Sequence, residues 1–168
     1  LRVCRRCPGV TMKGGGRAKV IPEYTNGPVS VRGATRYEAA MVNEKLLNCA
    51  RAAALATGCR MEYTDEGNPY WDMRQDKQLA KWYEAFWAEQ GGEPPIDYKI
   101  PHGSIDIGNL SYFFPCLHVN IRITPNDAVA GHSREFAECT MTDFAKEQML
   151  RTIKCLAMTG LEMLLKED

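Results

Sequence analysis

The chain has 168 residues, of which 45% are hydrophobic and 25% charged, a composition that excludes a disordered chain, a coiled coil and a collagen. It contains no stretch of the roughly 18 to 20 apolar residues that a membrane-spanning helix needs, and LRVCRRCPGV lacks the apolar core of a secretory signal. The seven cysteines are scattered and odd in number, which fits free thiols in a reducing compartment. We therefore expect a soluble, cytoplasmic protein with no membrane contact.

The 21 basic and 21 acidic residues cancel overall but are unevenly distributed. Residues 1–60 carry 11 basic and 3 acidic side chains, a net charge of +8, whereas residues 61–168 carry 10 and 18, a net charge of −8. A basic half can attract nucleic acid, but its arginines do not alternate with the aromatic residues that stack on bases. We expect no nucleic-acid partner, and two sub-structures whose charges are mostly solvated.

The first third of the chain predicts strands around one helix. Alternating β-branched residues predict a strand over 29–35, and residues 20–21 lie in another extended stretch. Apolar residues at three- and four-residue spacing then predict an alanine-rich helix of about twenty residues that ends at Gly58. Residues 60–64 alternate like a further short strand. The order ββαβ is typical of part of an open-faced α+β sandwich.

The remainder of the chain has a different pattern. Turn-forming residues at 65–70 are a candidate boundary between domains, and an aromatic stripe from Leu79 to Trp87 predicts a helix face buried in the core. Residues 118–123 alternate as a strand. A final helix fits Thr142–Lys166 with Thr142 as its cap. The residues expected on its core face are Ala145, Met149, Ile153, Leu156, Gly160 and Leu164.

Two short motifs suggest chemistry that their surroundings do not support. Cys4 and Cys7 have zinc-knuckle spacing, but no second pair of ligands follows at the usual distance. The glycine run 14–16 is not followed by the Gly-Lys-Ser/Thr of a phosphate-binding loop, so a turn between strands is the better interpretation.

The three histidines have different surroundings. His118 lies in the alternating segment, which favours a structural role, and His102 in a loop is ambiguous. His132 lies in AGHSREF, where Gly131 gives flexibility and Glu135 supplies a nearby carboxylate. A loop histidine near a carboxylate is suitable as a metal ligand with an oriented imidazole.

The loop GSIDIGN, residues 103–109, concentrates small and hydrogen-bonding residues that can approach a ligand closely. Asp106 has two interpretations: it holds a histidine or accepts a hydrogen bond from substrate, or it only closes the loop through an Asx turn. The segment alone leaves both interpretations open.

Five segments in this order resemble the C-terminal half of a known family: GGGRAKVIPEYTNGPVSVRGAT, CARAAALATGC, HGSIDIGNLSYFFP, AGHSREF and LRTIKCLAMTGLEML. The family is that of the zinc amidohydrolases and metallopeptidases, which includes aminoacylase, glutamate carboxypeptidase and hippurate hydrolase. Within it, the chain resembles the branch of the p-aminobenzoyl-glutamate hydrolase subunit and β-alanyl-lysine dipeptidase. The resemblance spans about residues 9–166 and depends mainly on the GS-x-D-x-GN-x-S and GH-S/T-x-E/Q elements.

For the fold, the resemblance implies an α/β protein in two parts. Residues 1–64 would be the C-terminal part of a lid, a partial ferredoxin-like α+β domain of order ββαβ that commonly mediates homodimerisation. Residues 65–168 would be the C-terminal part of a mixed-sheet α/β zinc-peptidase catalytic domain.

For the chemistry, the resemblance implies two zinc ions per complete active site and cleavage of the amide bond of small dipeptides or acyl-amino acids. His132 matches the last metal ligand of the family. The residues matched to the substrate side and the metal loop are Ser104, Asp106, Asn109, Gly131 and Glu135.

No catalytic residue is assigned, because the general base and the other metal ligands belong to the family's N-terminal half. The chain on its own is therefore expected to be inactive. The alternative is a non-catalytic dimerisation or regulatory module derived from the same family.

Overall fold

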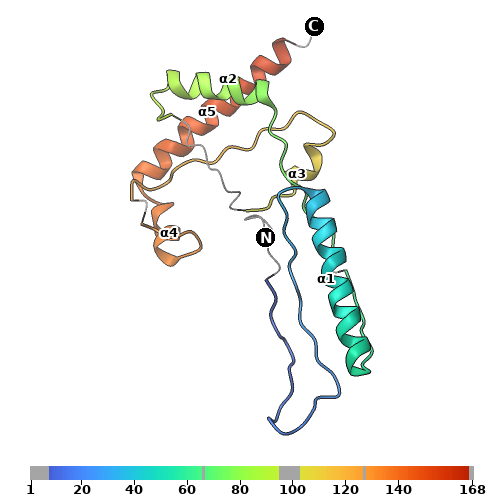
Figure 1. Cartoon of the computed structure of the whole chain (residues 1–168). Coiled ribbons are helices and arrows are strands. Elements are labelled where there is room, and N and C mark those ends of the chain that lie inside the picture. The colour runs from blue at the N-terminus through green and yellow to red at the C-terminus, as the bar shows by residue number, and fades with distance from the viewer. Residues whose placement is uncertain (1–7, 66, 95–102, 127, 167–168) are drawn as a thin grey trace. The chain divides into compact units, whose positions relative to one another are not determined.

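The computed structural model describes residues 8–65, 67–94, 103–126 and 128–166 (Figure 1). It divides into two compact units. The first comprises Leu1–Asp72 and Lys99–Gly108, and the second comprises Met73–Tyr98 and Asn109–Asp168.

The first unit begins with a hairpin, drawn in blue in Figure 1. Isolated antiparallel bridges join Gly9 to Val29 and Lys13 to Asn26, and the Ser30 amide donates to the Pro8 carbonyl at 2.9 Å. The predicted glycine turn therefore lies in the connection between the two bridged segments.

Helix α1, Arg36–Thr57, follows the hairpin and has clear signals at both ends. The Thr35 hydroxyl accepts a hydrogen bond from the Glu38 amide at 3.2 Å. Gly58 ends the helix at a left-handed φ of 69°, a conformation that glycine adopts without steric penalty. The predicted helix and its end at Gly58 are confirmed, and Leu47 is the helix residue that becomes buried.

A cluster around Arg36 joins the start of α1 to the end of this unit's first segment. The Arg36 guanidinium lies 4.2 Å from the centre of the Trp71 ring and 4.8 Å from that of Tyr37, within the range of cation–π attraction. The Arg36 amide donates to Asp72 Oδ1 at 2.7 Å, which satisfies one of the amides that a helix start leaves unpaired.

The second unit is built on two helices, α2 (Lys77–Glu89) and α5 (Asp143–Leu165), which lie side by side in Figure 1. Asp76 caps α2 by accepting from the amides of Gln78 and Leu79, both at 2.9 Å. Thr142 caps α5 by accepting from the Ala145 amide at 3.2 Å. The buried residues of the two helices are Leu79, Tyr83, Ala145, Cys155 and Thr159.

The predicted core face of α5 is wrong, although the helix and its cap are confirmed. Ala145 is buried, but the exposed fractions of Met149, Ile153, Leu156 and Leu164 are 49%, 54%, 40% and 74%. The reason is that α2 packs against the neighbouring face of α5, which carries Cys155 and Thr159.

The alternating segments do not form strands in the described residues. Residues 60–64 and 118–123 carry no strand, and residues 29–35 contain only isolated bridges before Thr35 caps α1. Strands need interstrand hydrogen bonds, and no described neighbour supplies a ladder for these segments. Instead, the Gln75 side chain binds both backbone groups of His118, accepting from its N–H at 2.8 Å and donating to its C=O at 2.6 Å.

Two short helices complete the second half of the chain: α3, Ile107–Leu110, and α4, Arg134–Cys139. Among the described residues, no helix has both the length and the apolar character needed to span a membrane.

Candidate functional site

The histidine that the sequence singled out has an unusual backbone conformation. His132 has a φ of 64°, in the left-handed region that non-glycine residues seldom occupy, and its side chain is exposed. Helix α4 begins directly after it, because the Ser133 hydroxyl accepts from the Phe136 amide at 3.0 Å. Such conformations cost energy and occur preferentially at binding and catalytic sites.

Glu135 lies in the first turn of α4, three residues after His132. A carboxylate at this position interacts favourably with the positive end of the helix dipole. The ion pair of this helix is formed elsewhere, between Arg134 Nε and Glu138 Oε1 at 3.3 Å. The structure therefore brings Gly131, His132 and Glu135 together on one exposed loop and helix start.

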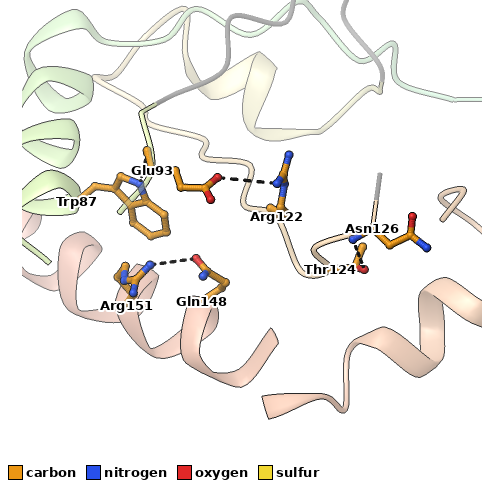
Figure 2. Close-up of polar contacts among 7 residues, drawn as sticks. All are labelled: Trp87, Glu93, Arg122, Thr124, Asn126, Gln148 and Arg151. Atoms are coloured by element: carbon orange, nitrogen blue, oxygen red, sulfur yellow. Dashed lines mark hydrogen bonds and ion pairs between the residues drawn. The ribbon is translucent and has the colours of Figure 1, made fainter. Parts of the chain in front are cut away.

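A tight turn leads towards this loop. The Thr124 hydroxyl accepts from the Asn126 amide at 3.1 Å, as Figure 2 shows, and Asn126 Oδ1 accepts from the Ala128 amide at 3.0 Å. These two side-chain-to-backbone hydrogen bonds stabilise the turn that precedes Gly131 and His132.

The second predicted site segment, the loop at 103–109, is divided between the units. Ser104 and Asp106 belong to the first unit and are exposed, whereas Asn109, in α3, belongs to the second unit together with His132. Asp106 Oδ1 accepts from the Ile107 amide at 2.9 Å, which is the local loop-closing contact expected from its Asx interpretation. Gly108 is buried and lies so close to the Trp71 carbonyl oxygen that a side chain would collide with it.

The described residues do not by themselves fit a zinc site. A protein zinc ion takes three or four side-chain ligands, and the described part of the chain contains no group of three histidine, cysteine or carboxylate residues close enough to share an ion. His118 is half-buried and its backbone is tied to Gln75. Cys4 and Cys7 lie outside the described residues.

A feature that the sequence did not predict is a cavity of about 290 Å³ in the second unit, lined by α2, α5 and residues 117–122. Trp87 Nε1 donates to the Glu93 carbonyl at 2.8 Å, and the Glu93 carboxylate lies 3.9 Å from Arg122 (Figure 2). Arg151 lies 5.4 Å from the Trp87 ring centre and donates to Gln148 at 3.4 Å.

One lining residue of this cavity is buried. Tyr83 stacks on Trp87 with ring centres 6.0 Å apart, and burial raises the pKa of its hydroxyl while neighbouring Thr152 lowers it. The only sign of this cavity in the sequence is the aromatic stripe, and such a stripe is equally typical of a helix face buried in the core. The cavity therefore combines aromatic walls with a mixed-charge rim.

No family model matches the chain, but two curated relatives do. The chain is 31% identical to the human Xaa-Arg dipeptidase over 170 aligned residues and 32% identical to the mouse Xaa-Arg dipeptidase over 164. These matches cover 97% and 96% of this chain but 38% of each relative, so the chain spans well under half of their length. The relatives support a dipeptidase or amidohydrolase family.

Proposed function

We propose that this chain is part of a zinc-dependent dipeptidase that hydrolyses the amide bond of small dipeptides. The observation that carries the proposal is the similarity over nearly the whole chain to two relatives named Xaa-Arg dipeptidase. Their name favours dipeptides with a C-terminal arginine over other acyl-amino acids as the substrate class. The substrate-side residues in this proposal are Ser104, Asp106, Asn109, Gly131 and Glu135.

In this proposal His132 supplies one metal ligand, and ligands from polypeptide outside this chain complete the site. The left-handed backbone at His132 supports the role, because it presents an exposed imidazole at a point fixed by the Ser133 cap of α4. Zinc, when bound, would supply Lewis acidity and an activated water. The chain's own contribution is to hold the imidazole and the adjacent Glu135 carboxylate in place.

We further propose that residues 1–64 serve as the lid of a cytoplasmic homodimer, with residues 65–168 in the catalytic part. The support is the resemblance; the two compact units have other bounds, since the first extends to Asp72 and includes Lys99–Gly108. A lid that is a separate unit can close over substrate while the metal-binding part stays rigid.

The test is a chimera in which this chain replaces the matching segment of the human Xaa-Arg dipeptidase. His132→Ala should lower its turnover of a Xaa-Arg dipeptide by at least about 100-fold and reduce its zinc content, because the loss of a ligand leaves a metal ion poorly held. His118→Ala is the matched control, and its turnover should stay within about threefold of the unsubstituted chimera. The hydrogen bonds to Gln75 are made by the His118 backbone, which the substitution keeps.

Equal activity and equal zinc content of the two variants would contradict the role of His132. The isolated chain should bind zinc weakly and show no turnover, because a single histidine does not make a catalytic zinc site. Calorimetric titration checks this, and two zinc ions bound tightly to the isolated chain would contradict it.

A further inference from the structure

Helix α1 and the predicted substrate-side loop belong to the same compact unit. The first unit contains α1 and extends to Asp72, and it also includes Lys99–Gly108, the stretch that carries Ser104 and Asp106. His132, on the predicted metal side, belongs to the second unit. Contacts inside the first unit can therefore fix the position of the loop without acting on the metal side.

Arg36, the first residue of α1, holds the segment that ends at Asp72. Its guanidinium carbon lies 4.2 Å from the centre of the Trp71 ring and 4.8 Å from that of Tyr37, and Nη2 donates to the Tyr37 hydroxyl at 2.8 Å. Its backbone amide donates to Asp72 Oδ1 at 2.7 Å. A planar cation against an indole ring and a charge-assisted hydrogen bond both restrict orientation, so the side chain and the backbone of Arg36 together fix Trp71 and Asp72.

Trp71 and Asp72 in turn form the surface against which the loop packs. Gly108 is buried, and a Cβ at this position would collide with the Trp71 carbonyl oxygen and lie 3.5 Å from the carbonyl carbon of Asp72. Only a residue without a side chain allows two backbones to approach so closely. The position of the loop therefore depends on the position of the Trp71 and Asp72 backbone.

The loop is short and closed by its own hydrogen bonds. The Gly108 amide donates to the Ile105 carbonyl at 3.2 Å, and Asp106 Oδ1 accepts from the Ile107 amide at 2.9 Å. The resulting turn contains Asp106 and follows Ser104 by one residue. A displacement of Gly108 would therefore move the polar side chains of the loop with it.

We propose that Arg36 is a positioning residue of the dipeptidase site: through Trp71 it fixes the loop at 103–109 and thus the substrate-side groups that this loop presents. The inference rests on the proposed function, which assigns Ser104 and Asp106 to the substrate side. Arg36 itself does not contact substrate. Its loss weakens substrate binding and leaves the bound zinc unchanged, because the metal ligand of this chain belongs to the other unit.

The first test measures the loop in the isolated chain by amide hydrogen exchange. Arg36→Met keeps an unbranched side chain and removes the guanidinium, and it should lower the protection of the Gly108 amide at least about tenfold. Arg51→Met is the matched control, because it makes the same change at an exposed arginine of α1 that pairs with Glu44. Its effect on the Gly108 amide should stay within about threefold.

A second pair of variants approaches the contact from the loop. Gly108→Ala puts a methyl group against the Trp71 carbonyl and leaves Arg36 intact, and it should lower the protection at position 108 as Arg36→Met does. Gly103→Ala is the matched control, because a Cβ there meets no described atom within 4 Å. The Leu47 amide of α1 should keep its protection in all variants, which separates a displaced loop from an unfolded helix.

The kinetic test uses the chimera with the human Xaa-Arg dipeptidase. Arg36→Met should raise the KM for a Xaa-Arg dipeptide at least about tenfold, whereas kcat and zinc content stay within about threefold, because binding common to the ground state and the transition state is lost. Arg51→Met should change none of the three by more than about threefold. A residue that only stabilised the fold would reduce the amount of active enzyme, and so the apparent kcat, without changing KM.

Three results would overturn the proposal. Unchanged protection of the Gly108 amide in Arg36→Met would show that Arg36 does not hold the loop, and an equal loss at Leu47 would show that Arg36 only stabilises α1. Lost protection with an unchanged KM would show that the loop does not position substrate. A chimera without turnover before any substitution would instead reject the proposed function, while the exchange measurements would still decide whether Arg36 fixes the loop, so the two failures can be told apart.

Discussion

The two units contain helices of nearly equal length that are stabilised in different ways. Helix α1 of the first unit has 22 residues and buries Leu47 alone, with Leu55 left 84% exposed. Helix α5 of the second unit has 23 residues and buries three of them, because α2 packs along it. Length and the threonine N-cap are similar, and the difference among the described residues is the helix α2 that packs along α5.

The comparison separates what forms a helix from what stabilises it. Thr35 and Gly58 fix the ends of α1, and its alanine-rich sequence has high helix propensity. These local terms are small, whereas most helix stability in proteins comes from packing of an apolar face. We expect the second unit to respond strongly to core substitutions and the first unit to respond mainly to changes at its caps.

The largest expected effect is on the helix pair. Leu79 is 8% exposed and lies in α2. Leu79→Ala should lower the free energy of unfolding of the second unit by about 2–3 kcal/mol, through lost apolar contact and the cavity left behind. Leu55→Ala in α1 is the control and should change stability by less than about 0.5 kcal/mol. Urea unfolding followed by circular dichroism measures both.

Similar losses for the two leucine variants would mean that the first unit buries Leu55 in solution. The contrast between a paired and an unpaired helix would then be lost.

An intermediate effect is expected at the helix caps. Asp76 accepts from two amides at the start of α2, and its own amide donates to the Cys116 carbonyl at 2.9 Å. Asp76→Ala should cost about 1–2 kcal/mol, and Thr35→Ala at the start of α1 about 0.5–1 kcal/mol, since Thr35 accepts a single bond. Thermal unfolding of each variant checks the order, and a larger cost for Thr35 would reverse our comparison.

The three long helices could be predicted from the sequence because their signals are local, whereas the short helices α3 and α4 lie in segments read as polar loops. Thr142 and Gly58 mark helix ends whatever surrounds them, and both were identified correctly. The strands at 60–64 and 118–123 depend on partners distant in sequence, and no described segment supplies them. The core face of α5 was assigned to the wrong side for the same reason, because periodicity finds an apolar face but does not say which neighbour covers it.

The candidate site was partly predictable for a related reason. His132 and Glu135 are close in sequence, so one motif identifies both, and the structure places them on one loop and helix start. The cavity beside Trp87 was missed because Glu93 and Arg122 reach it from separate segments. An aromatic stripe alone indicates burial, and only the tertiary arrangement adds the charged rim.

The smallest expected effect is a loss of stability in alkali that arises in the second unit. Cys155 is fully buried in α5, and burial raises the pKa of its thiol above the ordinary value of 9.0. The thiol therefore stays protonated in the folded chain when it begins to ionise in the unfolded chain. Its contribution to stability is complete below pH 9.0 and is lost as the pH rises towards the folded-state pKa, by at most about 1.4 kcal/mol per pH unit.

Cys155→Ala should flatten this decline when urea unfolding is compared between about pH 8 and 9.5, below the range in which Tyr83 ionises. Cys59→Ala, at an exposed cysteine of the first unit, is the control for the loss of a thiol outside the helix pair. Iodoacetamide should likewise alkylate Cys59 in the native chain and Cys155 only after urea is added, since the thiolate is the reactive form and the buried thiol is inaccessible. Rapid native alkylation of Cys155 would mean that α2 and α5 separate readily, and the second unit would then be no more firmly packed than the first.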